Sequence, residues 1–251
     1  MALKFKGFPW HHRLPTTTAV ESFDGPDLEK DLLRGIYSYG FERPSAFQRR
    51  SIQPIIDGRD FIGQAQSGTG QTLCFVAGVL QRIDVSCRTT PQALILAPSR
   101  ELAIQMSRVV LAVGDYMKAR CHTYIGGTSV RGDIDKVREG QHVVVGMHGR
   151  VFDMISKRHL RVDHLIMLVL GEMDEMLARS FKDQIYDIFR TLPPDIQVCG
   201  FSSTFAPEIL EMTDKFMRNT IRVLLSHKSE STWPLKKRSG SSTRSVTLMG
   251  S

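Results

Sequence analysis

The chain has 251 residues, of which 41% are hydrophobic, so it can build one large domain and is too apolar for a disordered polypeptide. No apolar run approaches the roughly 20 residues of a membrane-spanning helix, and the amino terminus lacks the apolar stretch of a secretory signal, so we expect no membrane association. The net charge of +7 points toward nucleic acid, but residues 227–251 carry five Lys or Arg against one Glu and hold most of the excess.

Short apolar runs alternate with amphipathic stretches along the chain, which is typical of parallel strands joined by crossover helices. The polar, irregular residues 1–25 predict a flexible arm, residues 26–226 a single domain, and residues 227–251 a disordered basic tail. The apolar runs are continuous, which favours strands buried on both faces of a sheet. The expected strands are 61–63, 93–97, 122–125, 142–145, 165–170, 198–201 and 221–225, and the expected helices 27–39, 73–80, 100–117, 133–139, 181–192 and 207–217. These elements predict an α/β fold with a mostly parallel sheet and helices on both faces.

The cysteines are Cys74, Cys87, Cys121 and Cys199. They lie far apart and form no CxxC pair, so buried thiols are favoured over a metal site or disulfides.

A Gly-rich segment, AQSGTGQT at residues 65–72, follows the first expected strand and precedes an apolar helix. Small residues let backbone N–H groups approach phosphates, and a helix N-terminus favours negative charge. Gln71 stands where the usual phosphate loop has Lys, so the charged donor is missing, whereas Thr72 still offers a hydroxyl to Mg²⁺. Taken alone, the segment fits a plain strand–helix turn as well as it fits a phosphate loop.

Further motifs surround this loop in a fixed order: GFERPSAFQ (40–48), APSREL (97–102), the Gly126-Gly127 pair, GMHGR (146–150), LGEMDEML (170–177) and SST (202–204). Over residues 21–225 this order resembles the first RecA-like domain of the DEAD-box RNA helicases, and stretches such as FKDQIYDIF resemble the initiation factor 4A type. The resemblance implies a P-loop fold, ATP and Mg²⁺ as cofactors, and RNA as a ligand held mainly through its backbone.

The resemblance also assigns roles by motif position. Nucleotide binding falls to Phe41, Gln48, Ser67, Gly68, Thr69, Gly70, Gln71 and Thr72, with Thr72 also the weak Mg²⁺ ligand. RNA contact falls to Pro98, Ser99, Arg100, Gly127, Gly149 and Arg150, and interdomain linkage to Ser202 and Thr204 of motif III. Catalysis falls to Glu172, which orients the attacking water, and to Asp174, which links to motif III. Plain core packing is the alternative for Phe41 and the upstream Phe23, and a helix-start surface position is the alternative for Arg100 and Arg150.

Motif II, GEMD at residues 171–174, departs most from the family pattern DEAD. Gly171 replaces the Asp whose carboxylate serves Mg²⁺, and Gln71 replaces the Lys that serves the phosphates. Both changes remove electrostatic stabilisation from the same developing charge. We therefore expect weak binding of ATP and Mg²⁺ and impaired hydrolysis. Met147-His148 replaces Thr-Pro in an RNA-contact loop, which puts RNA binding in question as well.

No segment after Leu225 resembles the second RecA-like domain, so we expect that domain to be absent from this chain. Three interpretations stay open: an ATP-dependent RNA helicase domain, a non-catalytic pseudoenzyme that binds RNA or translation-factor partners, and the product of a non-functional gene copy. The expected partners are RNA and a translation-initiation scaffold protein. We expect a monomer in the cytoplasm, with the nucleus as the alternative location.

Overall fold

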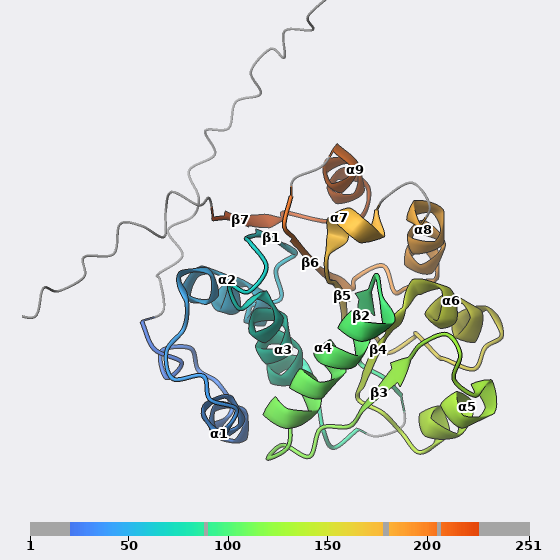
Figure 1. The fold of residues 1–251 in the computed structure, drawn as a ribbon, viewed down its shortest axis with the longest axis horizontal. Helices are drawn as coiled ribbons and strands as arrows, with labels where there is room; N and C mark the ends of the chain where they lie inside the picture. Colours follow the sequence, from blue (N-terminus) through green and yellow to red (C-terminus); the bar gives the residue numbers. More distant parts are fainter. Residues whose placement is uncertain (1–20, 88–89, 178–180, 205–206, 226–251) are drawn as a thin grey trace, which may run out of the picture.

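The computed structural model describes residues 21–225 apart from 88–89, 178–180 and 205–206, so residues 1–20 of the expected arm and the expected tail lie outside the described residues. Its centre is a parallel seven-stranded sheet in the order β3-β4-β2-β5-β6-β1-β7 (Figure 1). The strands are β1 (Phe61–Gln64), β2 (Ala93–Ala97), β3 (Cys121–Tyr124), β4 (Val143–Met147), β5 (Met167–Leu170), β6 (Gln197–Ser202) and β7 (Ile221–Leu224). The predicted α/β class and each predicted strand are confirmed, with ends shifted by a few residues.

Helices cover both faces of this sheet (Figure 1). They are α1 (Lys30–Ser38), α2 (Ala46–Ile56), α3 (Gln71–Arg82), α4 (Arg100–Val113), α5 (Val130–Arg138), α6 (His148–Ser156), α7 (Met173–Met176), α8 (Lys182–Thr191) and α9 (Pro207–Phe216). Helices α1 to α4 pack on one face, and α6 to α9 pack on the other.

Successive strand residues alternate between two hydrophobic cores because side chains along a strand point to opposite faces. On β2, Ile95 belongs to the core under α3 and α4, whereas Leu94 and Leu96 belong to the core under α6 and α8. Both sets are fully buried. The continuous apolar runs of the sequence thus arise from burial on both faces.

Helices α2, α6 and the short α7 were not among the expected elements. Helix α2 contains Pro54, which normally argues against a helix interior. A capping box starts the helix: the Ser45 side chain accepts from the Gln48 backbone N–H, and the Gln48 side chain accepts from the Ser45 backbone N–H. Helix α4 ends at Val113, before the expected residue 117, with Gly114 as its C-cap residue.

Two smaller features complete the fold. Phe23, inside the expected arm, is fully buried and lies edge-on to Tyr37 with ring centroids 6.2 Å apart. Cys74 and Cys199 are buried as expected, whereas Cys87 is exposed, so the prediction of buried thiols was wrong for that residue. No helix in the part of the chain that the structure describes combines the length and apolarity needed to cross a bilayer.

Candidate nucleotide and RNA site

The motif segments meet at the carboxyl ends of neighbouring strands, the edge where open α/β sheets bind ligands. Gln64, which leads into the phosphate loop, is in register with Ser202 of motif III. Across β2, Ala97 is in register with Met147, and Leu96 is in register with Leu170, which precedes motif II. Parallel register therefore brings together segments that are far apart in the sequence.

The phosphate loop has the backbone geometry that anion binding requires. Gly68 and Gly70 adopt φ values of +90° and +87°, a left-handed conformation that favours glycine. Gly70 is the N-cap of the twelve-residue helix α3, whose first N–H groups have no partner within the helix. Ser67 and Gly68 are exposed at the loop tip, and Thr69 and Thr72 are half-buried. The loop fits the phosphates of a nucleotide.

Gln71, at the position of the usual Lys, is turned back onto its own loop. Its Nε2 donates a hydrogen bond to the Ala65 carbonyl oxygen at 2.5 Å. A neutral amide that bonds the loop backbone stabilises the loop but supplies no positive charge to a phosphate. The substitution changes the role of this residue from ligand contact to loop closure.

Gln48 is 3% exposed and joins helix α2 to the phosphate loop. Its Oε1 accepts from the Ser45 N–H at 2.8 Å, and its Nε2 donates to the Gly70 carbonyl at 3.1 Å. The Ser45 hydroxyl adds a 2.8 Å bond to the Thr69 carbonyl. These contacts hold the phosphate loop against the start of helix α2. The Gln48 amide has a second hydrogen, which can donate to the edge of an adenine. Adenine contact by Gln48 stays a prediction.

Phe41 is half-buried and stacks on Tyr39 with ring centroids 5.3 Å apart and an interplanar angle of 20°. One edge of Phe41 packs against the core beneath α1 and α3. A half-buried ring is compatible with both hypotheses for Phe41, stacking on a base and packing at the edge of the core.

Methionine side chains fill the space around motif II. A Cβ added to Gly171 would lie 2.4 Å from Cε of Met106, on α4, and 3.6 Å from the Leu96 carbonyl oxygen. Met173, which stands where the family has Ala, is fully buried, and its Sδ would lie 1.9 Å from a Cβ added to Gly200. The place of the missing Asp side chain is therefore occupied by a thioether.

Glu172 follows Gly171 in a left-handed conformation, with φ 51° and ψ 59°, that is unusual for a residue with a side chain. It forms the N-cap of α7 and is half-buried. Burial, and then the nearby charges of Asp174 and Glu175, raise the pKa of Glu172 above its ordinary value. A carboxylate held in this way is suited to accept a proton.

Asp174 is tied to motif III by one carboxylate oxygen. Its Oδ2 accepts 2.8 Å hydrogen bonds from the hydroxyls of Ser203 and Thr204 and a 3.1 Å bond from the Thr204 backbone N–H. Burial by itself would raise the pKa of Asp174, but the motif III hydrogen bonds outweigh it and hold the pKa below its ordinary value. The described residues thus contain the link between motifs II and III that the sequence suggested. Ser202, fully buried, accepts from the same Thr204 N–H at 3.4 Å.

The residues present do not fit a Mg²⁺ ion. Magnesium requires oxygen ligands in an octahedral arrangement, and thioether sulfur is a poor substitute. Thr72 offers a hydroxyl, but Gly171 offers no side chain and Met106 lies where a carboxylate would start. Within the described ranges there is no group of three or more His, Cys, Asp and Glu side chains placed to hold a metal ion.

The predicted RNA-contact residues gather where β2, β3 and β4 end. Pro98 is buried, and Ser99 caps α4 by accepting from the Leu102 N–H at 3.3 Å. Arg100 is exposed and donates from one terminal nitrogen to the Gly126 carbonyl. Gly127 has φ +82°, and a Cβ there would lie 2.8 Å from the Arg100 guanidinium. The start of α4 therefore faces the loop that holds the Gly126-Gly127 pair, which we call the glycine loop.

At the start of α6, Arg150 does not have the exposed side chain expected of an RNA contact. Gly149 is exposed, but the Arg150 side chain is only 11% exposed and donates to the Ile125 and Thr128 carbonyls. His148, in the place of the family Pro, is buried with its ring centroid 4.4 Å from that of Phe181. Burial lowers the pKa of His148, which keeps the imidazole neutral and removes it as a phosphate contact.

Three residues that shape the site had no assigned role in the sequence. Ser45 holds the phosphate loop, Met106 fills the space beside Gly171, and Asp133 contacts Arg150. The Ser-x-x-Gln pattern before an apolar run could have revealed Ser45 as a helix cap. Met106 and Asp133 lie on helices distant in sequence from the motifs they touch, so no local pattern indicated them.

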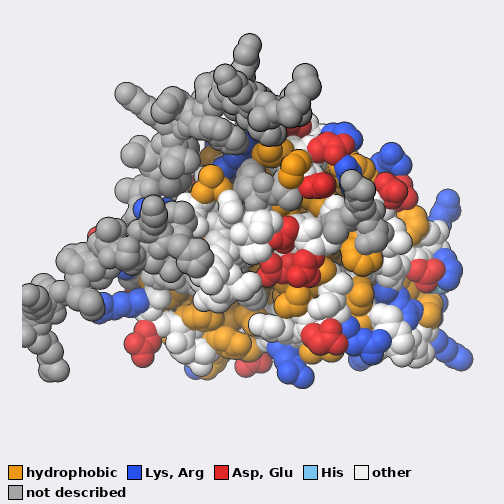
Figure 2. All heavy atoms as spheres, turned by 45° about the horizontal axis from the view of Figure 1, so that its top comes forward, with side chains coloured by type: hydrophobic (Ala, Val, Ile, Leu, Met, Phe, Trp, Pro, Cys, Tyr) orange, Lys and Arg blue, Asp and Glu red, His pale blue; other side chains and the backbone are white. Residues whose placement is uncertain are grey.

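Charge on the face shown in Figure 2 is mixed. In Figure 2, Asp and Glu side chains gather near the middle of the visible face, and Lys and Arg lie mostly around its margin. The described side chains visible there form no broad basic patch.

A family model described as DEAD/DEAH box helicase matches residues 45–213. The chain is similar to eukaryotic initiation factor 4A of Cryptosporidium parvum, with 57% identity over 206 residues that cover 82% of this chain and 51% of that protein. It is also similar to the ATP-dependent RNA helicase FAL1 of Mycosarcoma maydis, with 55% identity over 215 residues that cover 86% of this chain and 53% of that protein. The chain spans about half the length of the curated relatives it matches.

Solved structures agree with this relationship. The crystal structure of a DEAD box protein from Methanococcus jannaschii matches with a TM-score of 0.79 and 26% identity, covering 83% of this chain and 57% of that one. Dbp5 of S. cerevisiae, solved with Gle1 and IP6, matches with a TM-score of 0.74 and 32% identity, covering 82% of this chain and 53% of that one. The parallel sheet, the motif order and these matches show that the chain belongs to the DEAD-box helicase family, with relatives of the initiation factor 4A type.

Proposed function

We propose that this domain binds adenine nucleotide and RNA in the manner of an initiation factor 4A type helicase domain, and that it does so without turning ATP over. The observation that carries the proposal is the Gly171–Met106 contact beside an otherwise well-formed phosphate loop. The loop has left-handed glycines at a helix N-terminus and Asp174 bonds motif III, whereas the phosphate cation and the metal carboxylate are missing.

Nucleotide binding is supported by the loop itself. Left-handed glycines, the N-terminus of α3 and the buried Gln48 together form a rigid backbone cradle. Backbone N–H groups at a helix N-terminus bind phosphate without any cationic side chain. Because Gln71 contributes no charge, we propose weak affinity for ATP, with ADP bound through the same contacts.

Lack of turnover is supported by what remains of the catalytic groups. Glu172 keeps its carboxylate and Asp174 keeps its motif III partners. Transition-state charge at the phosphoryl group nevertheless meets neither a lysine nor a metal ligand at Gly171, and the loss of one such group commonly costs about 10²–10³-fold in rate. We therefore assign Asp174 a structural role, in which its carboxylate ties motif II to motif III.

RNA binding is proposed at the loops that follow β2, β3 and β4. Arg100 is exposed there and can reach a phosphate, and the glycine loop presents backbone N–H groups. Such contacts carry no base readout, so we propose binding that tolerates any single-stranded sequence.

The activity, partners and location of a longer protein are also proposals. Initiation factor 4A relatives are about twice as long as the matched segment, so a helicase activity of a longer protein, a translation-initiation scaffold partner and a cytoplasmic location are proposals drawn from those relatives. A non-catalytic binding role and the product of a non-functional gene copy are the alternatives, and binding measurements separate them.

The test is titration of the full chain with fluorescent ADP and with labelled single-stranded RNA. A matched pair of variants isolates the loop: Gly68→Ala and Gly58→Ala both place a side chain at a left-handed glycine with no neighbouring atom closer than 3.4 Å, but only Gly68 lies in the phosphate loop. We expect Gly68→Ala to abolish ADP binding and Gly58→Ala to retain it at a similar cost in stability, about 1–2 kcal/mol each. Absence of ADP and RNA binding by the wild-type chain at millimolar ligand would refute the proposal and favour the gene-copy alternative.

A further inference from the structure

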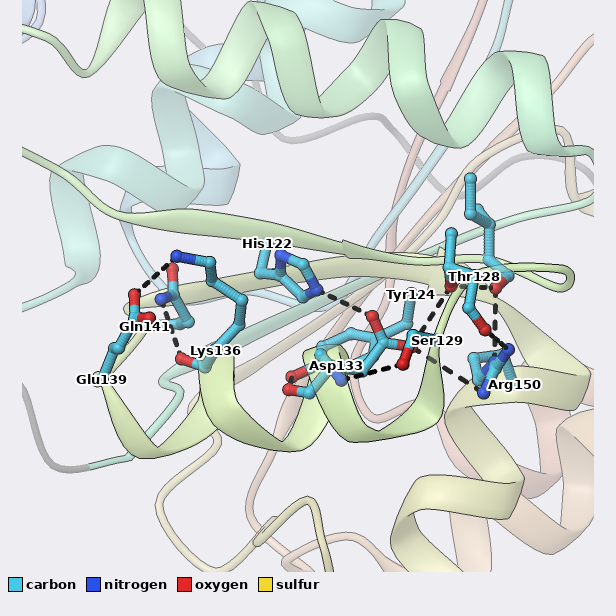
Figure 3. A network of polar contacts seen from close by, with 11 residues as sticks. His122, Tyr124, Thr128, Ser129, Asp133, Lys136, Glu139, Gln141 and Arg150 are labelled. Atoms are coloured by element: carbon cyan, nitrogen blue, oxygen red, sulfur yellow. Dashed lines mark hydrogen bonds and ion pairs between the residues drawn. The ribbon is translucent and has the colours of Figure 1, made fainter.

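Asp133 is a buried carboxylate at the centre of a polar network beneath the glycine loop (Figure 3). It lies in the first turn of α5 and is 3% exposed. Its Oδ1 lies 3.0 Å from His122 Nε2 on β3. Its Oδ2 lies 3.4 Å from the Thr128 hydroxyl, which donates to the Ile125 carbonyl at 2.8 Å. Arg150 of α6 approaches the same Oδ2 at 3.8 Å. One side chain thus connects β3, the glycine loop, α5 and α6.

Arg150 completes the network by holding the loop backbone. Its Nε donates to the Ile125 carbonyl at 3.2 Å and a terminal nitrogen donates to the Thr128 carbonyl at 2.8 Å. These carbonyls flank the Gly126-Gly127 pair, and the remaining terminal nitrogen faces Asp133. The planar guanidinium is therefore committed on three sides to partners within the protein.

We propose that Asp133 is a positioning residue for RNA binding: it anchors Arg150, and the pair fixes the glycine loop whose backbone meets the RNA. In this arrangement Arg150 supports the glycine loop from inside the protein and contacts no RNA phosphate. We call this role a strut. The inference rests on the proposed RNA-binding function and reassigns one residue of that site.

Burial and charge both favour this assignment. The Arg150 side chain is 11% exposed and that of Asp133 is 4% exposed. A buried carboxylate without a cation carries a large desolvation cost, so Asp133 holds Arg150 in place electrostatically as well as by geometry. Arg100, by contrast, is exposed and spends one terminal nitrogen on Gly126, which leaves its other donors for a phosphate.

The salt dependence of RNA affinity separates a strut from a phosphate contact. Each phosphate neutralised by a cationic side chain adds about 0.7 to the slope of log affinity against log salt for single strands. Loss of a phosphate contact therefore lowers the slope, whereas a misplaced loop lowers affinity at every salt concentration and leaves the slope unchanged. A role in stability alone changes neither quantity at a temperature where the variant is folded.

The experiment measures anisotropy of labelled single-stranded RNA with the full chain over a salt series, for wild type, Asp133→Asn, Arg150→Gln and Arg100→Gln. We expect Asp133→Asn and Arg150→Gln to weaken RNA binding about tenfold, the equivalent of one charge-assisted hydrogen bond, with the wild-type slope. We expect Arg100→Gln to lower the slope by about 0.7. Thermal unfolding curves fix a temperature at which each variant is folded.

Arg150→Lys decides the matter if Asp133→Asn does not fold. Lysine keeps the charge but cannot bond both carbonyls, so a strut predicts affinity as weak as in Arg150→Gln, and a phosphate contact predicts near wild-type affinity. A slope reduction in Arg150→Gln equal to that in Arg100→Gln, or unchanged affinity in Asp133→Asn, overturns the inference while RNA binding stands. Absence of RNA binding in the wild type overturns the proposed function and this inference with it.

Discussion

The methyl end of Met106 lies 2.4 Å from the point where a Cβ on Gly171 would stand. Helix α4 and motif II are thus packed to a glycine at that position, and a side chain at 171 must displace the thioether. The missing carboxylate of motif II is therefore part of a repacked contact, and its restoration has a structural cost.

Gly171→Asp is expected to destabilise the fold by about 1–3 kcal/mol because it overpacks the Met106 contact. Met106→Ala alone is expected to cost about 2–5 kcal/mol because it opens a cavity. The double variant should cost less than the sum, by at least about 0.5 kcal/mol, because the new carboxylate enters the vacated space. Urea unfolding of the two single variants and the double variant measures this coupling.

The double variant Gly171→Asp, Met106→Ala is also the one expected to make ADP affinity depend on Mg²⁺. Wild type serves as the control and should show little dependence, since a glycine and a thioether offer no oxygen ligand.

In the urea experiment, strictly additive free energies of unfolding would show that Met106 and position 171 do not compete for space.

Gln71→Lys is expected to raise nucleotide affinity about tenfold, because a charged donor to a phosphate is worth about 1.5–3 kcal/mol and part of that offsets the lost bond to the Ala65 carbonyl. Calorimetry with ADP measures the gain. Gln71→Met is the matched control, since it removes the same bond without adding charge. An equal gain in Gln71→Met would show that release of the loop, and not charge, limits affinity.

The lowered pKa of Asp174 predicts that the folded chain loses stability in acid. Its pKa is lowered in the folded chain, so its motif III hydrogen bonds contribute stability above the unfolded-state pKa of about 3.9 and lose it as pH falls through the lower folded-state pKa. The stability gap between wild type and Asp174→Asn should therefore be constant near neutral pH and shrink below about pH 4. Urea unfolding from pH 7 to pH 3 measures the gap.

Asp195→Asn is the control for this pH series because the Asp195 side chain is 90% exposed and forms its ion pair with Arg218 at the surface. It should change stability little at any of these pH values. A gap for Asp174→Asn that stays constant down to pH 3 would contradict the assigned role of the carboxylate.

Gln48→Ala is expected to cost about 1–2 kcal/mol, because it removes one half of the α2 capping box and the bond to the Gly70 carbonyl. It should also weaken ADP binding, since the phosphate loop loses its outer support. Gln53→Ala, on the same helix with an exposed bond to Asp57, is the control and should leave ADP affinity unchanged. Equal ADP affinity in Gln48→Ala and wild type would remove Gln48 from the site.

The inner strands were predictable because they are buried on both faces and form continuous apolar runs, as Ala93–Ala97 does, whereas the edge strands β3 and β7 are only partly buried. Helix α2 was not predicted because a proline such as Pro54 argues against a helix interior. Ser45 and Gln48 nevertheless have the sequence pattern of a capping box. Helix α6 was missed because Gly149 near its start obscured the helical spacing of the buried residues that follow.

The site was predictable as a set of motif positions but not as a set of contacts. The sequence shows that Gln71 lacks charge, but only the fold shows its amide bonded to Ala65. In the same way, Arg150 stands at a motif position for RNA contact, and only the packing of α5 against β3 and α6 brings Asp133 to it. Tertiary partners of this kind leave no local pattern in the chain.

The most direct test of the central claim is phosphate release from ATP by the full chain at a nucleotide concentration that saturates binding, with single-stranded RNA present. Glu172→Gln, which removes the remaining carboxylate of the water-orienting position, sets the background for trace contaminants. We predict that the wild-type chain releases phosphate no faster than Glu172→Gln while both bind nucleotide equally. RNA-stimulated release by the wild type well above the Glu172→Gln background would contradict it.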